Sequence, residues 1–302
     1  MTRAGIWRIG QLVFTALLIT LLWSAADGPE IMRILSQAQP LWLLTAIGIL
    51  ICQTFLSALR WKLTAAHLGQ VLQLPYAIKE YFMSQVVNQA LPGAVVGDAA
   101  RAVRARAQGG LAVATQAVVF ERLAGQIAMF ITMTSAFVVT NLSVGGLDWP
   151  LSIAAPIGTI IMVGCAVAAL IVLGQWVPAI LGTTLAGWMR PFYAALLSRR
   201  ALPGQVGLGA AITFCNLAAF GFCAWAVGVH LSVAALVAIV PVILFSMLIP
   251  FTVSGWGIRE GSAAILLPLA GTTPSEGVAA SVMFGVAMLL AVLPGLIAMV
   301  LK

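Results

Sequence analysis

The sequence predicts an all-α integral membrane protein: a polytopic bundle of about seven or eight transmembrane helices with two re-entrant or broken helical segments. Hydrophobic residues make up 62% of the 302 residues and charged residues only 8%, whereas soluble domains carry roughly 25% charged residues. Seven apolar runs approach or exceed the roughly 20 residues of a spanning helix. These runs are 9–26, 41–59, 124–142, 149–173, 205–229, 231–250 and 276–301.

The basic residues predict how the chain is oriented. Arg3 and Arg8 precede the first apolar run, 9–26, which is too long for the apolar core of about 7–15 residues in a signal peptide. We therefore expect an uncleaved first helix with the N-terminus in the cytoplasm, because basic residues in short loops stay on that side. The formal charge of +7 is explained in the same way.

The first broken segment is expected at 75–110, within a first half at about 1–145. Pro92 and Gly93 interrupt an apolar stretch there, and three arginines follow: Arg101, Arg104 and Arg106. If 74–91 crossed the membrane, these arginines would lie outside in a short loop, against the positive-inside rule. A re-entrant path that turns at the Pro-Gly pair avoids this. Irregular backbone at membrane depth must line a cavity or protein, so the break predicts a cavity.

A second broken segment is expected at 245–270, within a second half at about 146–302. Its breaking and charged residues are Pro250, Gly255, Gly257, Arg259 and Glu260. The spacing from its proline to its first glycine equals that from Pro92 to Gly97. Broken helices at corresponding positions of two halves are typical of transporter binding sites and compatible with an inverted pseudo-repeat.

The charges after the first break form a patterned group. Asp98 follows Gly97 where a helix can begin, so its carboxylate is expected to cap the first turn. Arg101 and Arg104 share a helix face with it, whereas Arg106 points elsewhere and is expected only to set topology. An arginine near the bilayer centre costs at least about 2.5–3.5 kcal/mol, so it needs a partner. The candidate carboxylates are Asp98, Glu121 and Glu260.

Two adjacent pairs of opposite charge lie at the edges of apolar runs, Glu121-Arg122 and Arg259-Glu260. Neighbouring side chains on a helix diverge by about 100°, so we expect each to bond across the bundle rather than within its pair. One such cross-pair, Glu121 with Arg259, could form a gate. Arg60, beside a tryptophan, is expected first as an interfacial anchor and second as part of the same basic vestibule.

Helix N-termini near 97–98 and 255–258 are expected to favour an anionic group such as a lipid phosphate. The guanidinium group of Arg101 or Arg259 could bind that phosphate at two points. The chain has no paired aspartates for a metal and diphosphate, no zinc-protease motif, no nucleophile elbow and no nucleotide loop. We therefore expect no catalytic residue, no metal and no cofactor. A nucleic-acid partner is not expected either, because no basic and aromatic array is present.

Several motifs together resemble the transmembrane, flippase-like domain of lysylphosphatidylglycerol synthases, over roughly residues 40–300. They are RW at 60–61, NQALPGAVVGDAARA at 88–102, AVVFERLAG at 117–125, IPFTVSGWGIREGSAA at 249–264 and LPG at 293–295. The resemblance implies a bacterial inner-membrane protein with a single flippase-like domain over 1–302, a stand-alone member without the aminoacyl-transferase domain. Val96 stands where the family has a glycine, and Glu121 where aspartate is common.

The resemblance further implies a translocase that moves a lipid between leaflets. The ligand would be an anionic or aminoacylated phospholipid, or another lipid-linked headgroup, and a lipid-modifying enzyme could be a partner. Two alternatives are a lipid or polyprenyl transferase with Glu121 or Glu260 as base, and a non-catalytic scaffold of a lipid-biosynthesis system. The expected binding residues are Arg60, Asn88, Asp98, Arg101, Arg104, Glu121, Arg122, Arg259 and Glu260. The expected structural breaks are Pro92, Gly93, Gly97, Pro250, Gly255 and Gly257.

Overall fold

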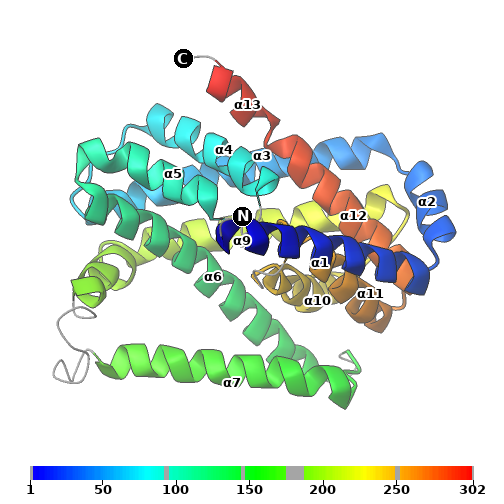
Figure 1. The fold of residues 1–302 in the computed structure, drawn as a ribbon. Helices are drawn as coiled ribbons and strands as arrows, with labels where there is room; N and C mark the ends of the chain where they lie inside the picture. The colour runs from blue at the N-terminus through cyan, green and yellow to red at the C-terminus, as the bar shows by residue number, and fades with distance from the viewer. Residues whose placement is uncertain (1–2, 92–94, 144–146, 175–186, 249–251, 301–302) are drawn as a thin grey trace.

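A computed structural model describes the chain apart from residues 1–2, 92–94, 144–146, 175–186, 249–251 and 301–302 (Figure 1). The described residues form helices and turns, and no strand is assigned among them. The α-helices of the first half are α1 (Arg3–Ala25), α2 (Gly28–Ser36), α3 (Pro40–His67), α4 (Leu74–Ala90), α5 (Val96–Ala105) and α6 (Leu111–Leu142). Those that follow are α7 (Leu151–Gly174), α9 (Leu202–Ala226), α10 (Val233–Ser246), α11 (Ile258–Leu266), α12 (Pro274–Ala291) and α13 (Leu293–Val300). The shorter helical turns are η1 (Arg106–Gln108), η2 (Tyr193–Leu197) and η3 (Leu267–Ala270).

The predicted polytopic helical membrane protein is confirmed. By length and composition, five described segments can cross a membrane: α3, α6, α7, α9 and the stretch Pro274–Val300. The bent pair of α1 and α2 is a sixth candidate, with an angle of 90° between its helices. This number is lower than the seven or eight expected. The difference arises partly because the apolar run 231–250 contains α10, which has only 14 residues with Pro241 inside it.

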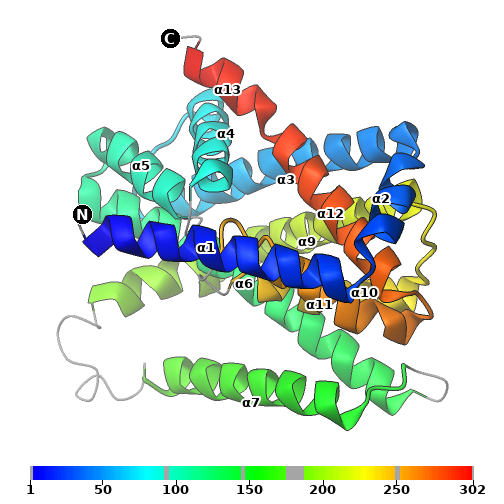
Figure 2. The ribbon, with the colours of Figure 1, turned by 45° about the vertical axis from the view of Figure 1, so that its right-hand side comes forward.

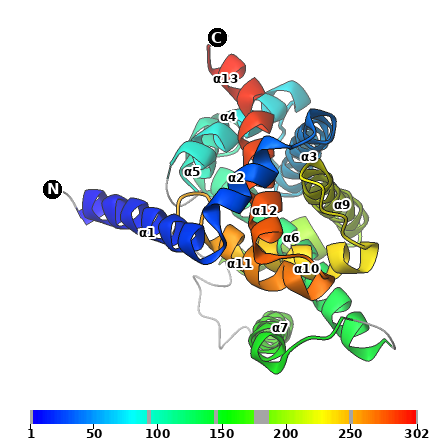
Figure 3. The ribbon, with the colours of Figure 1, turned by 90° about the vertical axis from the view of Figure 1, so that its right-hand side faces the viewer.

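The bend between α1 and α2 has a local cause. Asp27 has a φ of 50° and caps α2, with its carboxylate accepting from the Glu30 N–H at 3.4 Å. A side chain at Gly28 would overlap the ring of Trp23, so a larger residue at this corner would require the ring to move. From there α1 runs across α11 (Figures 2 and 3), and the Thr15 hydroxyl accepts from the Val253 N–H at 3.1 Å. The first helix therefore packs on the second break.

Two large hydrophobic cores, and a small third one of Phe120, Ala195 and Leu196, hold the bundle together. The larger joins α2, α3, α9, α10, α11 and α12, and Trp42 and Phe222 pack against it. These two rings and that of Trp225 form an aromatic cluster with ring centroids 5.2–5.6 Å apart. The smaller joins α3 to α6 and consists largely of alanines around Trp61 and Tyr81. Small residues let membrane helices approach closely. Helix α7 lies at the edge of the molecule in all three views, and Phe130 of α6 packs on its Gly164.

The first broken segment is a hairpin of α4 and α5. Its contacts pair increasing residue numbers on one helix with decreasing numbers on the other, as Asn88 meets Gly97 and Glu80 meets Arg104. The two helices are therefore antiparallel. A Cβ at Gly97 would overlap the Ser84 carbonyl oxygen, so this glycine sets how closely the helices pack. The predicted breaks Pro92 and Gly93 lie outside the described residues.

The second broken segment lies between α10 and α11. Gly255 and Gly257 have φ values of 81° and 88°, which only glycine adopts readily, so the expected break at these two positions is confirmed. Ser254 also has a positive φ, of 50°. Pro250 lies outside the described residues. Helix α11 then packs against α12, which places the second break beside the larger core.

Candidate functional site

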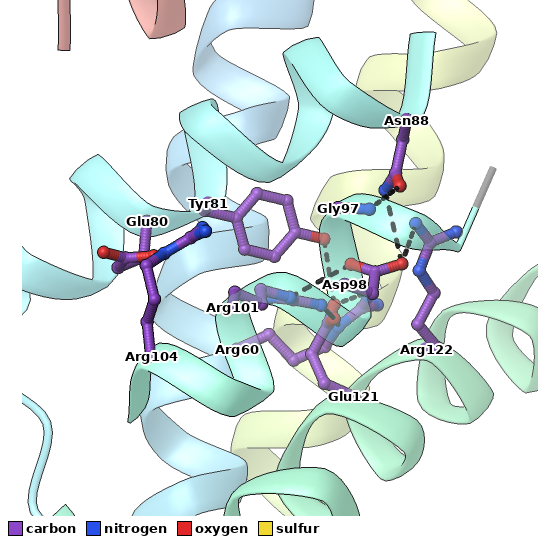
Figure 4. A network of polar contacts seen from close by, with 10 residues as sticks. All are labelled: Arg60, Glu80, Tyr81, Asn88, Gly97, Asp98, Arg101, Arg104, Glu121 and Arg122. Atoms are coloured by element: carbon purple, nitrogen blue, oxygen red, sulfur yellow. Dashed lines mark hydrogen bonds and ion pairs between the residues drawn. The ribbon is translucent and has the colours of Figure 1, made fainter. Parts of the chain in front are cut away.

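A buried carboxylate on α6 is the centre of the charged site (Figure 4). Glu121 is fully buried, and its Oε1 accepts hydrogen bonds from Arg60 Nη2 at 2.8 Å and from the Tyr81 hydroxyl at 3.2 Å. Its Oε2 accepts from Arg101 Nη2 at 2.8 Å. Four helices therefore meet at one carboxylate, because Arg60 belongs to α3, Tyr81 to α4 and Arg101 to α5.

Arg101 is enclosed on every side that the structure describes. Its exposed fraction is 0%, and its guanidinium lies 4.8 Å from the ring centroid of Trp61 and 4.4 Å from that of Tyr81. Its Nε is 3.0 Å from Asp98 Oδ1. Desolvated cation–π contacts of this kind contribute about 2 kcal/mol each. Arg101 thus holds the hairpin against α3 and α6. It was expected to bind a phosphate, but its side chain is buried and lines neither side of the cavity described below.

Asp98 links this buried group to a second arginine. One carboxylate oxygen faces Arg101, while the other pairs with Arg122 of α6 and accepts from the Asn88 amide at 3.3 Å. The expected capping role of Asp98 is wrong, since the Gly97 N–H donates to the Asn88 side-chain oxygen at 2.8 Å. Helix α5 begins at Val96, two residues before Asp98, so a residue of the preceding helix caps it.

A separate ion pair lies further along the hairpin. Arg104 bonds to Glu80 of α4, and its side chain is 36% exposed, so it belongs to the edge of the site. Glu80 and Tyr81 were missed by sequence reasoning. If α4 and α5 are assumed to be antiparallel, Glu80 lies opposite Arg104 and Tyr81 lies opposite Arg101, so this assumption could have identified both residues. Arg106 is exposed, and its expected role in topology stays a prediction.

The second break carries its own charged group. Arg259 is 1% exposed and bonds to Glu260 and to the Ser281 hydroxyl at 3.0 Å. Its guanidinium lies 4.9 Å from the ring centroid of Trp256 and 5.8 Å from that of Phe284. The expectation that adjacent charges bond across the bundle holds for Glu121 and Arg122 but is wrong here.

The reason is the cap of α11. Glu260 Oε2 accepts from the Gly257 N–H at 2.7 Å, which turns the carboxylate back over the first turn, where the neighbouring Arg259 reaches it. The expected gate between Glu121 and Arg259 is therefore not formed. At both helix N-termini a backbone N–H already donates to a side chain, that of Glu260 for α11 and that of Asn88 for α5. They are therefore not the open anion sites that were expected.

A cavity lies between the two breaks. This outer cavity has a volume of about 520 Å³ and is bounded by the start of α5, by α6 and by the segment after α10. Its polar lining includes Asp98, Arg122 and Ser254. Ser254 donates to Gln89 of α4 at 2.6 Å, which joins the two breaks at one wall. The remaining lining residues are Val95, Ala99, Ala102, Thr115, Val118, Val119, Leu123, Gln126, Met247, Leu248, Thr252 and Gly255.

The cavity predicted from the first break is thus present, but only some of the predicted binding residues line it. Asp98 and Arg122 line it, whereas Arg101 and Arg259 pack in protein beside it. The other predicted binding residues, Arg60, Asn88, Arg104, Glu121 and Glu260, are not in its lining. Within the described residues, no group of three or more His, Cys, Asp or Glu side chains could hold a metal ion.

Comparison with known proteins identifies the family to which the chain belongs. No curated protein sequence matches it. The model of the family described as the lysylphosphatidylglycerol synthase TM region matches residues 8–295. This match spans nearly the whole chain and includes both breaks and every charged residue of the site. The protein therefore belongs to the family of the lysylphosphatidylglycerol synthase TM region and is a multi-pass membrane protein of lipid metabolism.

Proposed function

We propose that the protein is a lipid translocase that moves a phospholipid or another lipid-linked amphiphile between the two leaflets of the bacterial inner membrane, with its N-terminus in the cytoplasm. The observation that carries this proposal is the outer cavity, where an ion pair of Asp98 and Arg122 lies among apolar side chains. A polar site with an apolar surround suits an amphiphile. Soluble ligands would gain little from the apolar part.

The headgroup would bind at Arg122, whose side chain is 36% exposed and so accessible from the cavity. A lipid phosphate can compete with Asp98 for this guanidinium, because both are oxyanions that accept charge-assisted hydrogen bonds. The acyl chains would lie along Val119, Leu123 and Leu248, which are 36–43% exposed. Arg101, which is itself bonded to Glu121, would hold the Asp98 side chain in place while the phosphate replaces it at Arg122.

The transferase alternative has less support. Both of its candidate bases, Glu121 and Glu260, accept hydrogen bonds from arginine. Neither side chain is in the lining of the outer cavity, where the headgroup is proposed to bind. We therefore propose a transporter rather than an enzyme.

Leaflet exchange in proteoliposomes tests the proposal. Purified protein is reconstituted with a fluorescent phosphatidylglycerol, and a membrane-impermeant reductant quenches the outer leaflet. We expect exchange that depends on the protein and that falls about 10- to 100-fold in Arg122→Gln, since an interaction with a charged group is lost. Arg106→Gln, which removes an exposed arginine outside the cavity, is the matched control and should exchange normally. Exchange no faster than in empty liposomes, with folded protein, would refute the proposal.

A further inference from the structure

A second cavity, with both polar and apolar lining residues, adjoins the outer one. This inner cavity has a volume of about 220 Å³, and apart from Leu248 its lining residues are buried or half-buried. It shares three lining residues with the outer cavity: Arg122, Gln126 and Leu248. The side chain that pairs with Asp98 is therefore part of the boundary between the two cavities.

Uncharged side chains that can form hydrogen bonds make up seven of the sixteen lining residues of the inner cavity. They are Gln53, Ser57, Tyr81, Gln85, Gln126, Thr213 and Asn216. Its charged lining residues are Arg60, Glu121 and Arg122. Arg60 is 4% exposed, and its Nη1 is buried without a hydrogen-bond partner, although its other nitrogens bind Glu121. A buried donor of this kind favours a ligand that brings an oxygen to it.

The ionic network that borders both cavities has unequal charges. Three arginines, Arg60, Arg101 and Arg122, share two carboxylates, Asp98 and Glu121, so one positive charge is in excess. Glu80 is already paired with Arg104. The other carboxylates of the chain have different surroundings: Glu30 pairs with Arg33, Glu260 pairs with Arg259, Asp27 and Glu276 cap α2 and α12, and Asp148 is exposed. A single added anion would balance the network, whereas an ammonium group would add to the excess.

We infer that the substrate is a lipid with one phosphodiester charge and an otherwise uncharged headgroup that carries hydroxyl or amide groups. The phosphodiester binds at Arg122 in the outer cavity, and the uncharged polar group enters the inner cavity. This inference rests on the proposed function and narrows it, because it selects anionic lipids over aminoacylated ones. Both carboxylates of the network are bound to arginines, so neither is available to an ammonium group.

Lipid binding to the purified full-length chain tests this inference with four probes. Phosphatidylglycerol has the phosphodiester and the hydroxyls, and phosphatidylmethanol has the same charge without hydroxyls. Phosphatidylcholine is zwitterionic, and lysylphosphatidylglycerol carries added ammonium groups. We expect phosphatidylglycerol to bind about 3- to 10-fold more tightly than phosphatidylmethanol, as neutral hydrogen bonds allow, and both to bind more tightly than the other two. Equal binding of the first two, or tighter binding of lysylphosphatidylglycerol, would overturn the inference.

Substitutions in each cavity test which cavity is responsible for which lipid preference. Asn216→Leu and Gln85→Leu change residues of the inner cavity alone, so each should remove the preference for phosphatidylglycerol over phosphatidylmethanol. Arg122→Gln should instead remove the preference for phosphatidylmethanol over phosphatidylcholine. Arg106→Gln is again the control, and thermal unfolding shows whether each variant is folded. If both inner-cavity variants are folded and keep the preference, the inner cavity does not bind the headgroup.

A soluble headgroup separates a lipid from a free phosphate ester. Glycerophosphoglycerol should not displace phosphatidylglycerol at equal concentration, because it lacks the chains that contact the apolar wall. Displacement at equal concentration would overturn the lipid assignment. The selectivity and the transport can also fail separately. Absent leaflet exchange refutes the proposed function, whereas absent headgroup selectivity in an active protein refutes only this inference.

Discussion

The two broken segments place an arginine in similar surroundings but connect it differently. Arg101 and Arg259 are each buried between two aromatic rings and bonded to a carboxylate. Arg101 pairs with Asp98 of its own helix and also bonds to a carboxylate of another helix, Glu121 of α6, which it shares with Arg60 of α3. The carboxylate of Arg259 belongs to the next residue, Glu260. The first segment is thus connected to its neighbours through charge, and the second contains its own ion pair.

This difference indicates where function is located. The first network continues from Arg101 through Asp98 to Arg122, which lines the cavity. The second group ends within the protein at Ser281 and Met288. A ligand at Arg122 would therefore affect the first hairpin directly. The second segment contributes cavity wall, and its ion pair serves mainly to hold α11 against α12.

The largest loss of stability is expected for Glu121→Gln. The change leaves Arg60 and Arg101 buried without their shared carboxylate, and breaking a buried pair in this way costs about 3–5 kcal/mol. The free energy of unfolding in mixed detergent measures the loss. Glu276→Gln, at the exposed cap of α12, is the matched control and should change it little. A similar free energy of unfolding for both variants would show that the shared carboxylate of Glu121 does not contribute this stability.

A smaller loss is expected for Arg259→Met, about 2–3 kcal/mol, because Glu260 keeps its bonds to the Gly257 N–H and to Ser281. Adding Glu260→Gln should recover part of this loss if the ion pair is self-contained. The same unfolding measurement on the single and double variants provides a double-mutant cycle. If the stability losses of the two single variants simply add in the double variant, Arg259 and Glu260 do not act as a pair. The proposed difference between the two broken segments would then be contradicted.

Gly97→Ala should cost about 1–3 kcal/mol, as overpacking typically does, because the new Cβ meets the Ser84 backbone and the hairpin must open. Gly207→Ala is the matched control. It lies within α9, and nothing is within 4 Å of an added Cβ there, so the change should be neutral or stabilising. Thermal unfolding of both variants separates the effect of contact from that of helix propensity. Equal midpoints would mean that close α4–α5 packing is dispensable.

The smallest effect is expected for Asn88→Ala, which removes the cap of α5 and a hydrogen bond to Asp98, at about 1 kcal/mol. Ser232→Ala removes the cap at the N-terminus of α10, the helix that precedes the second broken segment, and provides the comparison. We expect similar stability losses, but only Asn88→Ala should alter lipid binding at Arg122. A binding change in both variants would argue against the functional difference between the two segments.

Part of the site could be predicted from local sequence. The glycine breaks at 255 and 257 and the shared direction of Asp98, Arg101 and Arg104 follow from properties of a few neighbouring residues. The Glu260 cap is also local, because Glu260 accepts from the Gly257 N–H three residues before it; the divergence of adjacent side chains on a helix does not take this cap into account. Glu80 and Tyr81 could not be assigned, since their role depends on the register of α4 against α5. The division into halves related by an inverted repeat stays a prediction.

The sequence by itself determined a helical membrane bundle with two breaks, because apolar length, Pro and Gly act locally on the chain. Only the tertiary structure decided which charges meet. Glu121 lies 61 residues from Arg60 and 20 from Arg101, so its partners depend on how four helices pack. The same packing buries Arg101 and leaves Arg122 at the cavity, although both are arginines on short polar stretches. Exposure to the cavity, and with it the site proposed for the lipid, is set by helix packing rather than by residue type.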